Sequence, residues 1–466
     1  MRKKISKNTA TNMFFVIMSL ACPTMLEQLM QTAVQYIDTA MVGSLGTQAT
    51  AAVGATTTVN WLLNSSISAL GIGFLAFIAK SLGAGDRAAA RRAVAQAALA
   101  VLVVGSVFTM ATLALSGVIP VWMRVKREIR HTASQYFFIL YTPMLFRTAT
   151  IIFGTVLRAA GDTKTPMKIG IVVNVINVIL NTLLIYPTRP VFDGAFTMPG
   201  AGLGVIGAAI ASAVAFAVGG ILITIVLWRH PLISPKGQKL APDMQILRPC
   251  LRVAFPNMLQ RFGTSLGYVA FASMINALGD VAAAAHTIAN TVESAFYIPG
   301  FGMQSAAATL AGNAYGANDE KRMKSLAKMF IPIEIGLMIL SGGALFAAAP
   351  ALVRIFSSSE EVIVLGSTVL RMVALSEPLY GFSIIIEGMM QGVGKTKLPF
   401  VFNIIGMWMI RIVGTFICTQ MLGHGLVSAW ACMIAHNVFL FFIFLICYIR
   451  GAWNPLRDSA GAGSNK

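Results

Sequence analysis

The chain has 466 residues, of which 56% are hydrophobic and only 11% are charged. A soluble protein carries about a quarter charged residues, so this composition excludes an ordinary soluble domain and indicates a membrane protein. The net charge of +18 would also suit a nucleic-acid binder, but the mean hydropathy of +0.75 favours the membrane. No nucleic-acid partner is expected.

The five cysteines and five histidines are scattered along the chain. They form no CxxC pair, no zinc-ligand spacing and no Ser/His/Asp or HExxH arrangement. We therefore expect no catalytic residue, no metal site and no cofactor, and the protein is not expected to be an enzyme.

Apolar windows long enough to cross a bilayer, about 20 residues, recur along the whole chain. The basic N-terminus and the first window together have the outline of a signal peptide, but no small-residue cleavage site follows, so we expect an uncleaved first span. The twelve predicted spans are 14–38, 50–78, 93–120, 134–157, 166–187, 204–228, 249–276, 283–311, 326–350, 364–390, 398–420 and 425–449.

The distribution of basic residues predicts the orientation of these spans. Most of the 35 Lys and Arg residues fall in cytoplasmic segments if both termini are cytoplasmic. We therefore expect a multi-pass protein of the plasma (inner) membrane with both termini in the cytoplasm. We also expect a monomer in contact with membrane lipids.

An internal repeat is visible when the sequence is shifted by half its length. The shift aligns Pro23 with Pro256, and Gly161-Asp-Thr-Lys with Gly394-Lys-Thr-Lys. Six spans per half is an even number, so both halves enter from the same side and the repeats are parallel. We predict an all-α membrane protein with two parallel-repeat six-helix lobes around a central cleft. The predicted domains are lobes at 1–228 and 249–466, the second with a short cytoplasmic tail, joined by a cytoplasmic linker at 229–248.

Polar residues follow one face of the first span. Glu27, Gln31 and Asp38 lie within about 40° of one another on a helix. A carboxylate is a costly way to bind a neighbouring helix, so a functional role is favoured over structural hydrogen bonding. Pro23, four residues before Glu27, removes a backbone hydrogen bond and allows the helix to bend.

Three asparagines share one face of the fifth span: Asn174, Asn177 and Asn181. They suggest a hydrogen-bonded network or an ion shell. The alternative is a purely structural contact between helices, which we prefer for Asn174.

Further acidic residues lie in the second half. Glu293 and Glu387 lie deepest in their windows and are candidates for contacting a cationic substrate. For Glu334, Glu377 and Arg371, a structural ion pair or an interfacial position is the preferred interpretation.

Two segments resemble a known transporter family. Pro23 to Gly46 (PTMLEQLMQTAVQYIDTAMVGSLG) is similar to the first span of the multidrug and toxic compound extrusion family in its proline, its aspartate fifteen residues on and its V-G-x-L-G ending. Leu157-Arg-Ala-Ala-Gly-Asp-Thr-Lys164 matches the family's L-R-x-x-G-D-T-K loop. Within the family the chain most resembles the prokaryotic DinF-like branch.

The resemblance implies an antiporter that exports small organic, often cationic, substrates in exchange for protons or sodium. It assigns Asp38 as the coupling aspartate, with Asn177, Asn181 and Ser212 around it. Glu27 and Gln31 are candidate substrate contacts. One carboxylate among neutral oxygens is a poor tight metal site, so protons are favoured over sodium.

Other transport functions remain as alternatives. A lipid-linked saccharide flippase of the same broad superfamily would favour a larger basic cavity. A major-facilitator antiporter is disfavoured, because Ala90 stands where its loop signature needs a glycine. Neither a filter-like loop nor a nucleophile and base pair supports a channel or a membrane-embedded enzyme.

Overall fold

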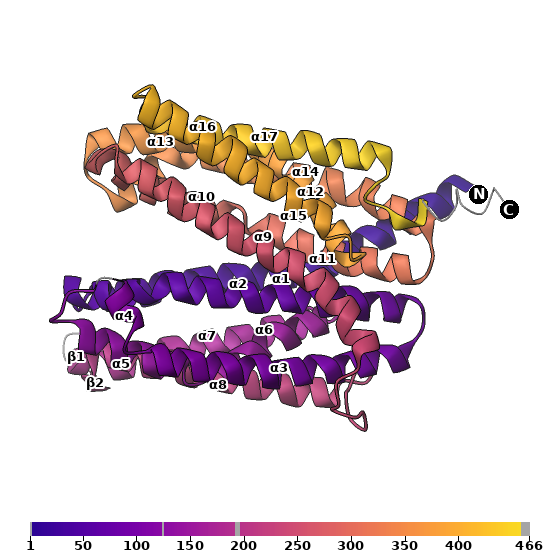
Figure 1. Ribbon diagram of the computed structural model, residues 1–466, viewed down its shortest axis with the longest axis horizontal. Helices are drawn as coiled ribbons and strands as arrows, with labels where there is room; N and C mark the ends of the chain where they lie inside the picture. Colours follow the sequence, from indigo (N-terminus) through magenta and orange to yellow (C-terminus); the bar gives the residue numbers. More distant parts are fainter. Residues whose placement is uncertain (1, 124, 192–195, 458–466) are drawn as a thin grey trace. The chain divides into compact units, whose positions relative to one another are not determined.

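The computed structural model describes residues 2–123, 125–191 and 196–457 (Figure 1). The helices in the first half are α1 (Arg2–Gly43), α2 (Thr47–Gly83), α3 (Arg87–Leu115), α4 (Ile119–Trp122), α5 (Arg130–Tyr141), α6 (Met144–Ala159), α7 (Lys164–Ile185) and α8 (Gly204–Arg229). Those in the second half are α9 (Met244–Asn276), α10 (Asp280–Phe296), α11 (Ile298–Gly316), α12 (Glu320–Phe356), α13 (Glu360–Ala374), α14 (Glu377–Gly392), α15 (Lys397–Ile405), α16 (Val413–Phe416) and α17 (Leu426–Arg450), with π-helices η1 (Gly406–Ile412) and η2 (Ile417–Met421).

The chain divides into two compact units. The first contains Met1–Met25, Leu75–Asp86 and Pro249–Lys466, and the second contains Leu26–Phe74 and Arg87–Arg248. The units differ from the lobes predicted at 1–228 and 249–466, because the start of α1 and the end of α2 pack with the C-terminal half. Both helices therefore contribute residues to both units.

The second unit is built around α8. This helix packs against α5, α6 and α7, and α3 packs against α6 (Figure 1). Glycines on α8 allow this close packing, because a Cβ on Gly207 would lie 2.5 Å from the Leu184 carbonyl oxygen of α7 and one on Gly220 would lie 2.5 Å from the Phe146 carbonyl oxygen of α6.

The first unit has two hydrophobic cores. One joins Ile17 and Leu20 of α1 to α11, α12, α14 and α17, and it includes Phe330 and Phe444. The other joins α9, α10, α12, α13 and α17 around Trp430. The beginning of α1 is thus held by residues from the second half of the sequence.

The predicted spans coincide with helices or helix pairs. Within the described residues, eight helices are long and apolar enough to cross a membrane, or ten if each bent pair is one span. The pair α5 and α6 bends by 48° next to Pro143, and the pair α13 and α14 bends by 52° next to Pro378. The two other predicted spans are α9, which contains three arginines, and the pair α10 and α11, whose members are short.

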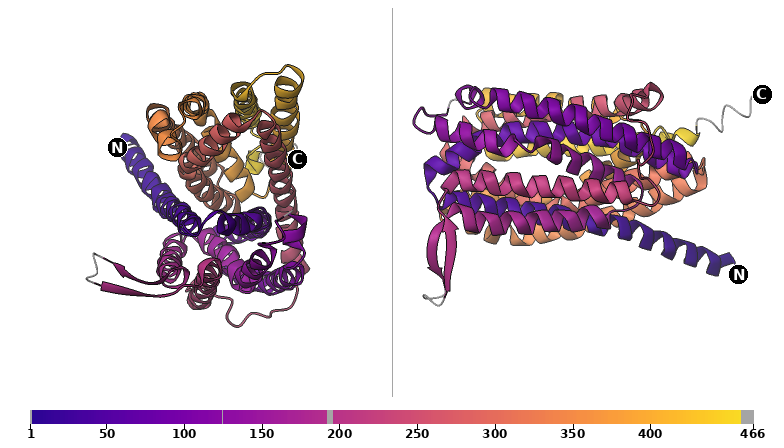
Figure 2. Two further views of the ribbon diagram at one scale, coloured as in Figure 1. Left: turned by 90° about the vertical axis from the view of Figure 1, so that its left-hand side faces the viewer. Right: turned by 90° about the horizontal axis from the view of Figure 1, so that it is seen from below.

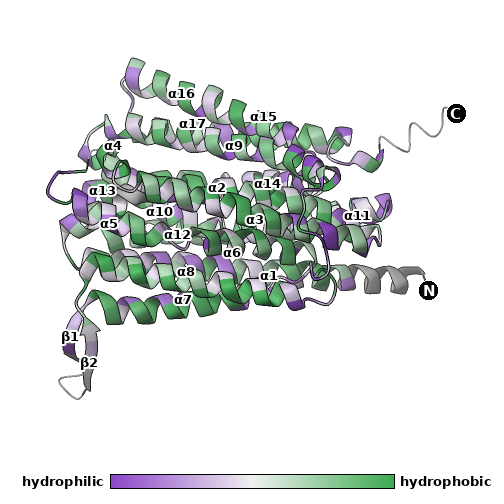
Figure 3. Ribbon diagram, turned by 60° about the horizontal axis from the view of Figure 1, so that its bottom comes forward, coloured by the Kyte–Doolittle hydropathy of each residue, from purple (hydrophilic) through white to green (hydrophobic). Residues whose placement is uncertain are grey.

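Apolar residues dominate the middle of these helices, and hydrophilic residues gather at their ends and in the loops (Figure 3). Many large apolar side chains face outward, such as Leu340, which is 72% exposed, and Met110, which is 65% exposed. Such exposure is costly in water and favourable in hydrocarbon, so the surface fits a multi-pass membrane protein.

A β-hairpin between α7 and α8 was not predicted. Strand β1 (Pro187–Val191) pairs antiparallel with β2 (Phe196–Ala201), and the hairpin projects from the helices of its unit (Figure 2). The Thr188 hydroxyl accepts a hydrogen bond from the Gly200 amide at 3.1 Å. Both strands contain proline, which is rare in β-strands, so no strand was predicted here from the sequence.

The repeat is visible in the loops of the structure. Residues at equivalent positions of the two halves adopt left-handed backbone conformations: Gly46 and Gly279 have φ of 108°, and Gly85 and Asn318 have φ of 77° and 53°. Asparagine is among the few non-glycine residues that tolerate this region. The two halves therefore use the same turn geometry at these positions.

A reciprocal contact joins the end of α2 to the end of α11 in the first unit. A Cβ on Gly83 would lie 2.0 Å from the Asn313 carbonyl oxygen, and one on Gly316 would lie 1.8 Å from the Lys80 carbonyl oxygen. Gly83 is the repeat equivalent of Gly316, and Lys80 is that of Asn313. The contact has the self-complementary form of a two-fold interface, as parallel repeats require.

Candidate ion-coupling site

Four side chains predicted around a coupling ion meet in the second unit. Asp38 of α1 accepts a hydrogen bond on Oδ1 from Nδ2 of Asn181 on α7 at 2.6 Å. The Asn181 Nδ2 also lies 3.1 Å from Oδ1 of Asn177, one turn earlier on α7. The other end of the Asn177 amide lies 3.1 Å from Oγ of Ser212 on α8. Asn177 and Asn181 are buried, whereas Asp38 is half-buried.

The Asn177 amide fits Asp38 in either of its two orientations. Its end facing Asp38 lies 2.8 Å from Oδ1 and 3.2 Å from Oδ2. If that end is the nitrogen, it donates to a charged carboxylate, and the Ser212 hydroxyl donates to the amide oxygen. If it is the oxygen, a proton on Asp38 is needed to make a hydrogen bond. The network can therefore accommodate both protonation states of Asp38.

Tyr136 and Arg147 extend this site but carried no sequence motif. Tyr136 of α5 is buried and interacts electrostatically with both Asp38 and Arg147. The Arg147 guanidinium of α6 lies over the Phe216 ring at 4.5 Å, and its Nη1 has no hydrogen-bond partner among the described residues. Their placement near Asp38 was not predicted, because spacing within one helix does not show that residues of α5 and α6 lie close to α1.

Glu27 forms an ion pair instead of standing free for a substrate. Nη1 of Arg158 on α6 lies 3.1 Å from Oε2 of Glu27, and Nη2 donates to the Thr155 hydroxyl at 3.2 Å. The side chain of Glu27 is 13% exposed and that of Arg158 is 17% exposed. Gln31, one turn along α1, is exposed. Arg158 belongs to the L-R-x-x-G-D loop, whose sequence did not predict this partner.

Glu387 lies in the first unit, next to the repeat equivalents of Glu27 and Arg158. Its Oε1 accepts from Gln260 at 2.8 Å and from Gln391 at 3.1 Å, and its Oε2 accepts from Asn403 at 3.3 Å. Gln260 occupies the repeat position of Glu27, and Gln391 that of Arg158. The two halves thus place polar clusters at matching positions, one an ion pair and the other a carboxylate held by amides.

Glu293 of α10 has a separate partner in the same unit. The Tyr297 hydroxyl donates to its Oε1 at 2.6 Å, and the side chain is 4% exposed. Among the described residues, Glu334 is fully buried and both of its oxygens lack a hydrogen-bond partner, so it forms no structural ion pair there. Arg371 instead lies over the Phe346 ring at 5.6 Å.

Pro23 lies inside α1, which continues as one helix past it. The hydroxyl of Thr24 donates to the Leu20 carbonyl at 3.1 Å. On the adjoining face, Gly302 of α11 is so close that a Cβ on it would lie 2.4 Å from Cγ of Met25. A glycine of α11 therefore allows close packing beside the proline.

Comparison with known proteins identifies the family. A family model described as MatE matches residues 23–183 and 256–417, the two halves of the repeat. The "Probable multidrug resistance protein NorM" of Thermotoga maritima is 26% identical over 437 residues, covering 94% of this chain and 92% of that protein. The structure "Crystal structure of MATE in the bent conformation" aligns with a TM-score of 0.86 and 21% identity, over 96% of both chains. The straight conformation aligns with a TM-score of 0.84 and 22% identity, over 95% of this chain and 96% of that one. These matches confirm the predicted two-lobe helical membrane fold, and the chain belongs to the MatE family of transporters.

Proposed function

We propose that this protein is an efflux antiporter that exports organic, often cationic, compounds in exchange for protons bound at Asp38. The names of its relatives support a multidrug substrate range. The multi-pass chain would lie in the plasma (inner) membrane with both termini in the cytoplasm, as the basic loops suggest.

The observation that carries the proposal is the fit of the Asn177 amide to both forms of Asp38. A coupling residue must be stable charged and neutral, because the transport cycle visits both forms. Asp38 has donors in Asn181 and in one orientation of Asn177, and it has an acceptor in the other orientation. Rotating the amide exchanges these partners and gives up the hydrogen bond from Asn181 to Asn177.

Protons fit this site better than sodium. Sodium would be held by several oxygens at once, whereas Asp38 is the one carboxylate hydrogen-bonded within the Asn177, Asn181 and Ser212 group. The unpartnered Oδ1 of Asn181 and the Asn177 oxygen would be the remaining ligands for sodium. We therefore propose proton coupling and keep sodium as the alternative outcome of the experiment.

A change of shape in α1 would connect the proton to the substrate. Pro23 weakens the helix fifteen residues before Asp38, so two backbone shapes differ little in energy. A proton shifts their populations only if it binds one shape more tightly. We propose that protonated Asp38 favours the shape that closes the substrate space of its lobe, which expels a bound cation.

Glu293 and Glu387 are proposed as secondary contacts for a cationic substrate. Each is a carboxylate inside a predicted span, where a charge is costly without a partner. Their hydrogen-bond partners are neutral hydroxyl and amide groups, and Arg411 and Arg261 act on them electrostatically, so a cationic substrate would compete with these arginines.

Transport in proteoliposomes tests the proposal. A cationic dye is loaded, and a pH gradient and a sodium gradient are imposed separately in wild-type and Asp38→Asn vesicles. We expect export by wild-type protein with the pH gradient alone. Export that needs sodium and ignores pH would transfer the role to sodium, and full export by the Asp38→Asn variant would refute Asp38.

A further inference from the structure

A buried arginine in the first unit has N–H groups with no hydrogen-bond acceptor among the described residues. Arg411 lies on the π-helix η1 and is 3% exposed. Among the described residues, Nε and Nη2 of Arg411 have no hydrogen-bond partner. Arg411 also forms no ion pair with any of these residues. A buried guanidinium with free N–H groups is strongly unfavourable, so an added hydrogen-bond acceptor would stabilise it.

Aromatic rings compensate the charge only in part. The guanidinium carbon lies 4.1 Å from the centre of the Phe271 ring and 4.8 Å from that of Tyr268, both on α9. Such contacts leave the N–H groups in the plane of the guanidinium free to donate. Glu293 interacts electrostatically with Arg411, but its Oε1 already accepts from Tyr297.

Further buried polar groups near Arg411 lack hydrogen-bond partners among the described residues. These are Nδ1 of His286, both ring nitrogens of His436, and Nε1 of Trp430, whose ring packs against His286, in residues that are each at least 92% buried. Both imidazoles are close enough to Arg411 to interact with it electrostatically. The Trp430 N–H is a donor only, and a neutral imidazole donates from one nitrogen. The set is rich in donors.

The fold positions these groups through two local features. A Cβ on Gly406 would lie 2.3 Å from Cδ2 of His436, so the glycine allows the imidazole to pack against η1. The His286 ring packs edge-on between Phe271, at 5.5 Å, and Trp430, at 5.9 Å. π-helical turns are frequent at functional sites, and this one carries Arg411.

The repeat gives this cluster a clear relation to the ion-coupling site. Phe271 is the repeat equivalent of Asp38, and Arg411 follows the equivalent of Asn177 by one residue. Where the second unit has a carboxylate held by amide donors, the first unit has a guanidinium on an aromatic ring. The two halves thus carry groups of opposite charge close to corresponding positions of the repeat.

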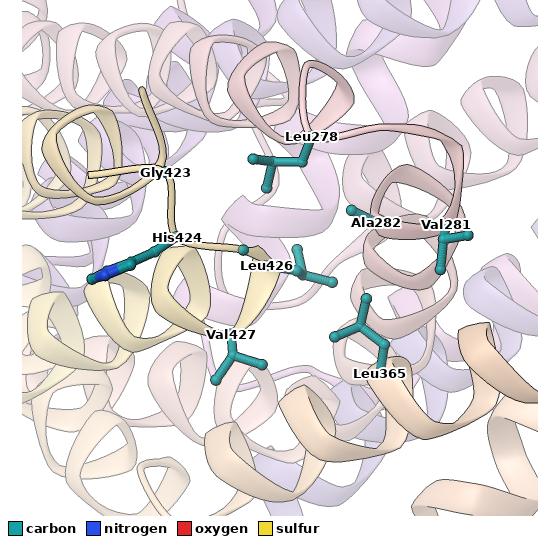
Figure 4. A pocket seen from close by; sticks show the side chains of 9 residues that line it. Leu278, Val281, Ala282, Leu365, Gly423, His424, Leu426 and Val427 are labelled. Atoms are coloured by element: carbon teal, nitrogen blue, oxygen red, sulfur yellow. The ribbon is translucent and has the colours of Figure 1, made fainter. Parts of the chain in front are cut away.

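A pocket lies beside the helical turns that precede Trp430 and His286. Its volume is about 500 Å³, and Figure 4 shows Leu278, Leu365 and Leu426 among its mostly apolar lining, with His424 at one side. Leu426 precedes Trp430 by one turn of α17, and Ala282, also in the lining, precedes His286 by one turn of α10. An amphipathic molecule could place its apolar body in the pocket and its charged end toward Arg411.

We propose that the Arg411 cluster binds the carboxylate of a small amphipathic organic anion or zwitterion. The guanidinium and the Trp430 N–H would donate to the carboxylate oxygens, and the pocket would hold the apolar part. The transporter would then recognise an acidic group on its substrate in this half, independently of the ion that Asp38 binds. Chloride has the same charge, so the experiment must separate it from a carboxylate.

Binding of benzoate to the purified full-length protein in detergent, measured by titration calorimetry, tests the site without any ion gradient. Wild-type protein should bind benzoate, and chloride should compete only weakly. Arg411→Gln should weaken binding at least about tenfold, since a charge-assisted hydrogen bond is lost. Arg371→Gln, which removes an arginine of the same unit from outside the cluster, should change binding less than about twofold.

Stability measurements keep the test decisive. Removing an unpaired buried charge relieves desolvation, so Arg411→Gln should unfold at the same or a higher temperature than wild type. If that variant does not fold, Trp430→Phe replaces it, and we expect weaker benzoate binding from the loss of one donor. Absence of benzoate binding to wild-type protein, equal binding by Arg411→Gln, or a site that takes chloride but excludes benzoate would overturn the proposal.

Discussion

At the scale of single residues, Asn177 is the group that can distinguish the two protonation states of Asp38. It contacts Asp38 on one side and Ser212 on the other, and its amide can present a donor or an acceptor. Asn181 differs, because its nitrogen donates to Asp38 at 2.6 Å and its oxygen has no hydrogen-bond partner among the described residues. Asn174 is the natural comparison, because it lies on the same helix outside this hydrogen-bonded group.

Replacing Asn177 should uncouple proton binding from export. We expect Asn177→Leu to reduce pH-driven dye export about tenfold, because Asp38 loses the partner that changes with its protonation. Asn174→Leu should stay within about twofold of wild type. Initial efflux rates from proteoliposomes give the comparison. Equal rates for the two variants would show that the amide plays no part in coupling.

The Glu27 and Arg158 ion pair should matter for stability. Glu27→Gln removes the carboxylate that pairs with the largely buried Arg158, which typically costs about 3 kcal/mol. The double variant Glu27→Gln with Arg158→Leu removes both charges and should recover most of that loss. Thermal unfolding in detergent measures both. A Glu27→Gln variant as stable as wild type would mean that the pair is electrostatically unimportant.

At the scale of elements, α1 connects the two compact units, and Pro23 lies close to the boundary between them. Residues before the boundary are held by the core around Ile17 and Phe330, whereas Asp38 belongs to the other unit. A bend at Pro23 is therefore a natural way for the Asp38 end of α1 to move while its beginning stays fixed.

Replacing Pro23 with alanine should stiffen α1 and slow export. Alanine restores the backbone hydrogen bond, so one helix shape gains stability over the other. Dye affinity should change little. Pro332→Ala in α12 is the matched control, because it also restores a hydrogen bond inside a predicted span. An efflux rate unchanged by Pro23→Ala would leave the proline as ordinary packing and favour rigid-body motion of the lobes.

The reciprocal contact between α2 and α11 should be intolerant of any side chain. Gly316→Ala would place a Cβ 1.8 Å from the Lys80 carbonyl oxygen, which forces the helices apart and costs about 1–3 kcal/mol. Gly343→Ala on α12 meets nothing within 4 Å and should be neutral or slightly stabilising. Unfolding temperatures of the two variants are compared. Equal temperatures would contradict the close contact.

At the scale of the whole molecule, much of the architecture follows from the sequence. Twelve apolar windows and a repeat offset of half the length predicted the helices and the matching turns, because the bilayer imposes length and hydropathy on each span. The hairpin was not predicted, because proline is rare in strands and its segments therefore have the composition of a loop. The start of α1 and the end of α2 pack with the C-terminal half. This packing depends on contacts between residues far apart in the sequence, so it was not predicted.

The candidate site was predictable only where helical spacing reports a shared face. Asn177 and Asn181 lie four residues apart, so their meeting could be expected, and the resemblance to the family supplied Asp38. The ion pair of Glu27, the position of Tyr136 and the isolation of Arg411 depend on which helices meet. The spacing of residues within one helix does not show which other helices contact it.

Proton release on substrate binding tests the exchange at Asp38 most directly. If substrate and proton bind competing states, saturating weakly buffered wild-type protein with a cationic dye should release about one proton per dye bound. The Asp38→Asn variant should bind the dye and release none. Equal proton release by both proteins, or dye binding by wild-type protein that releases no proton, would contradict coupling through Asp38.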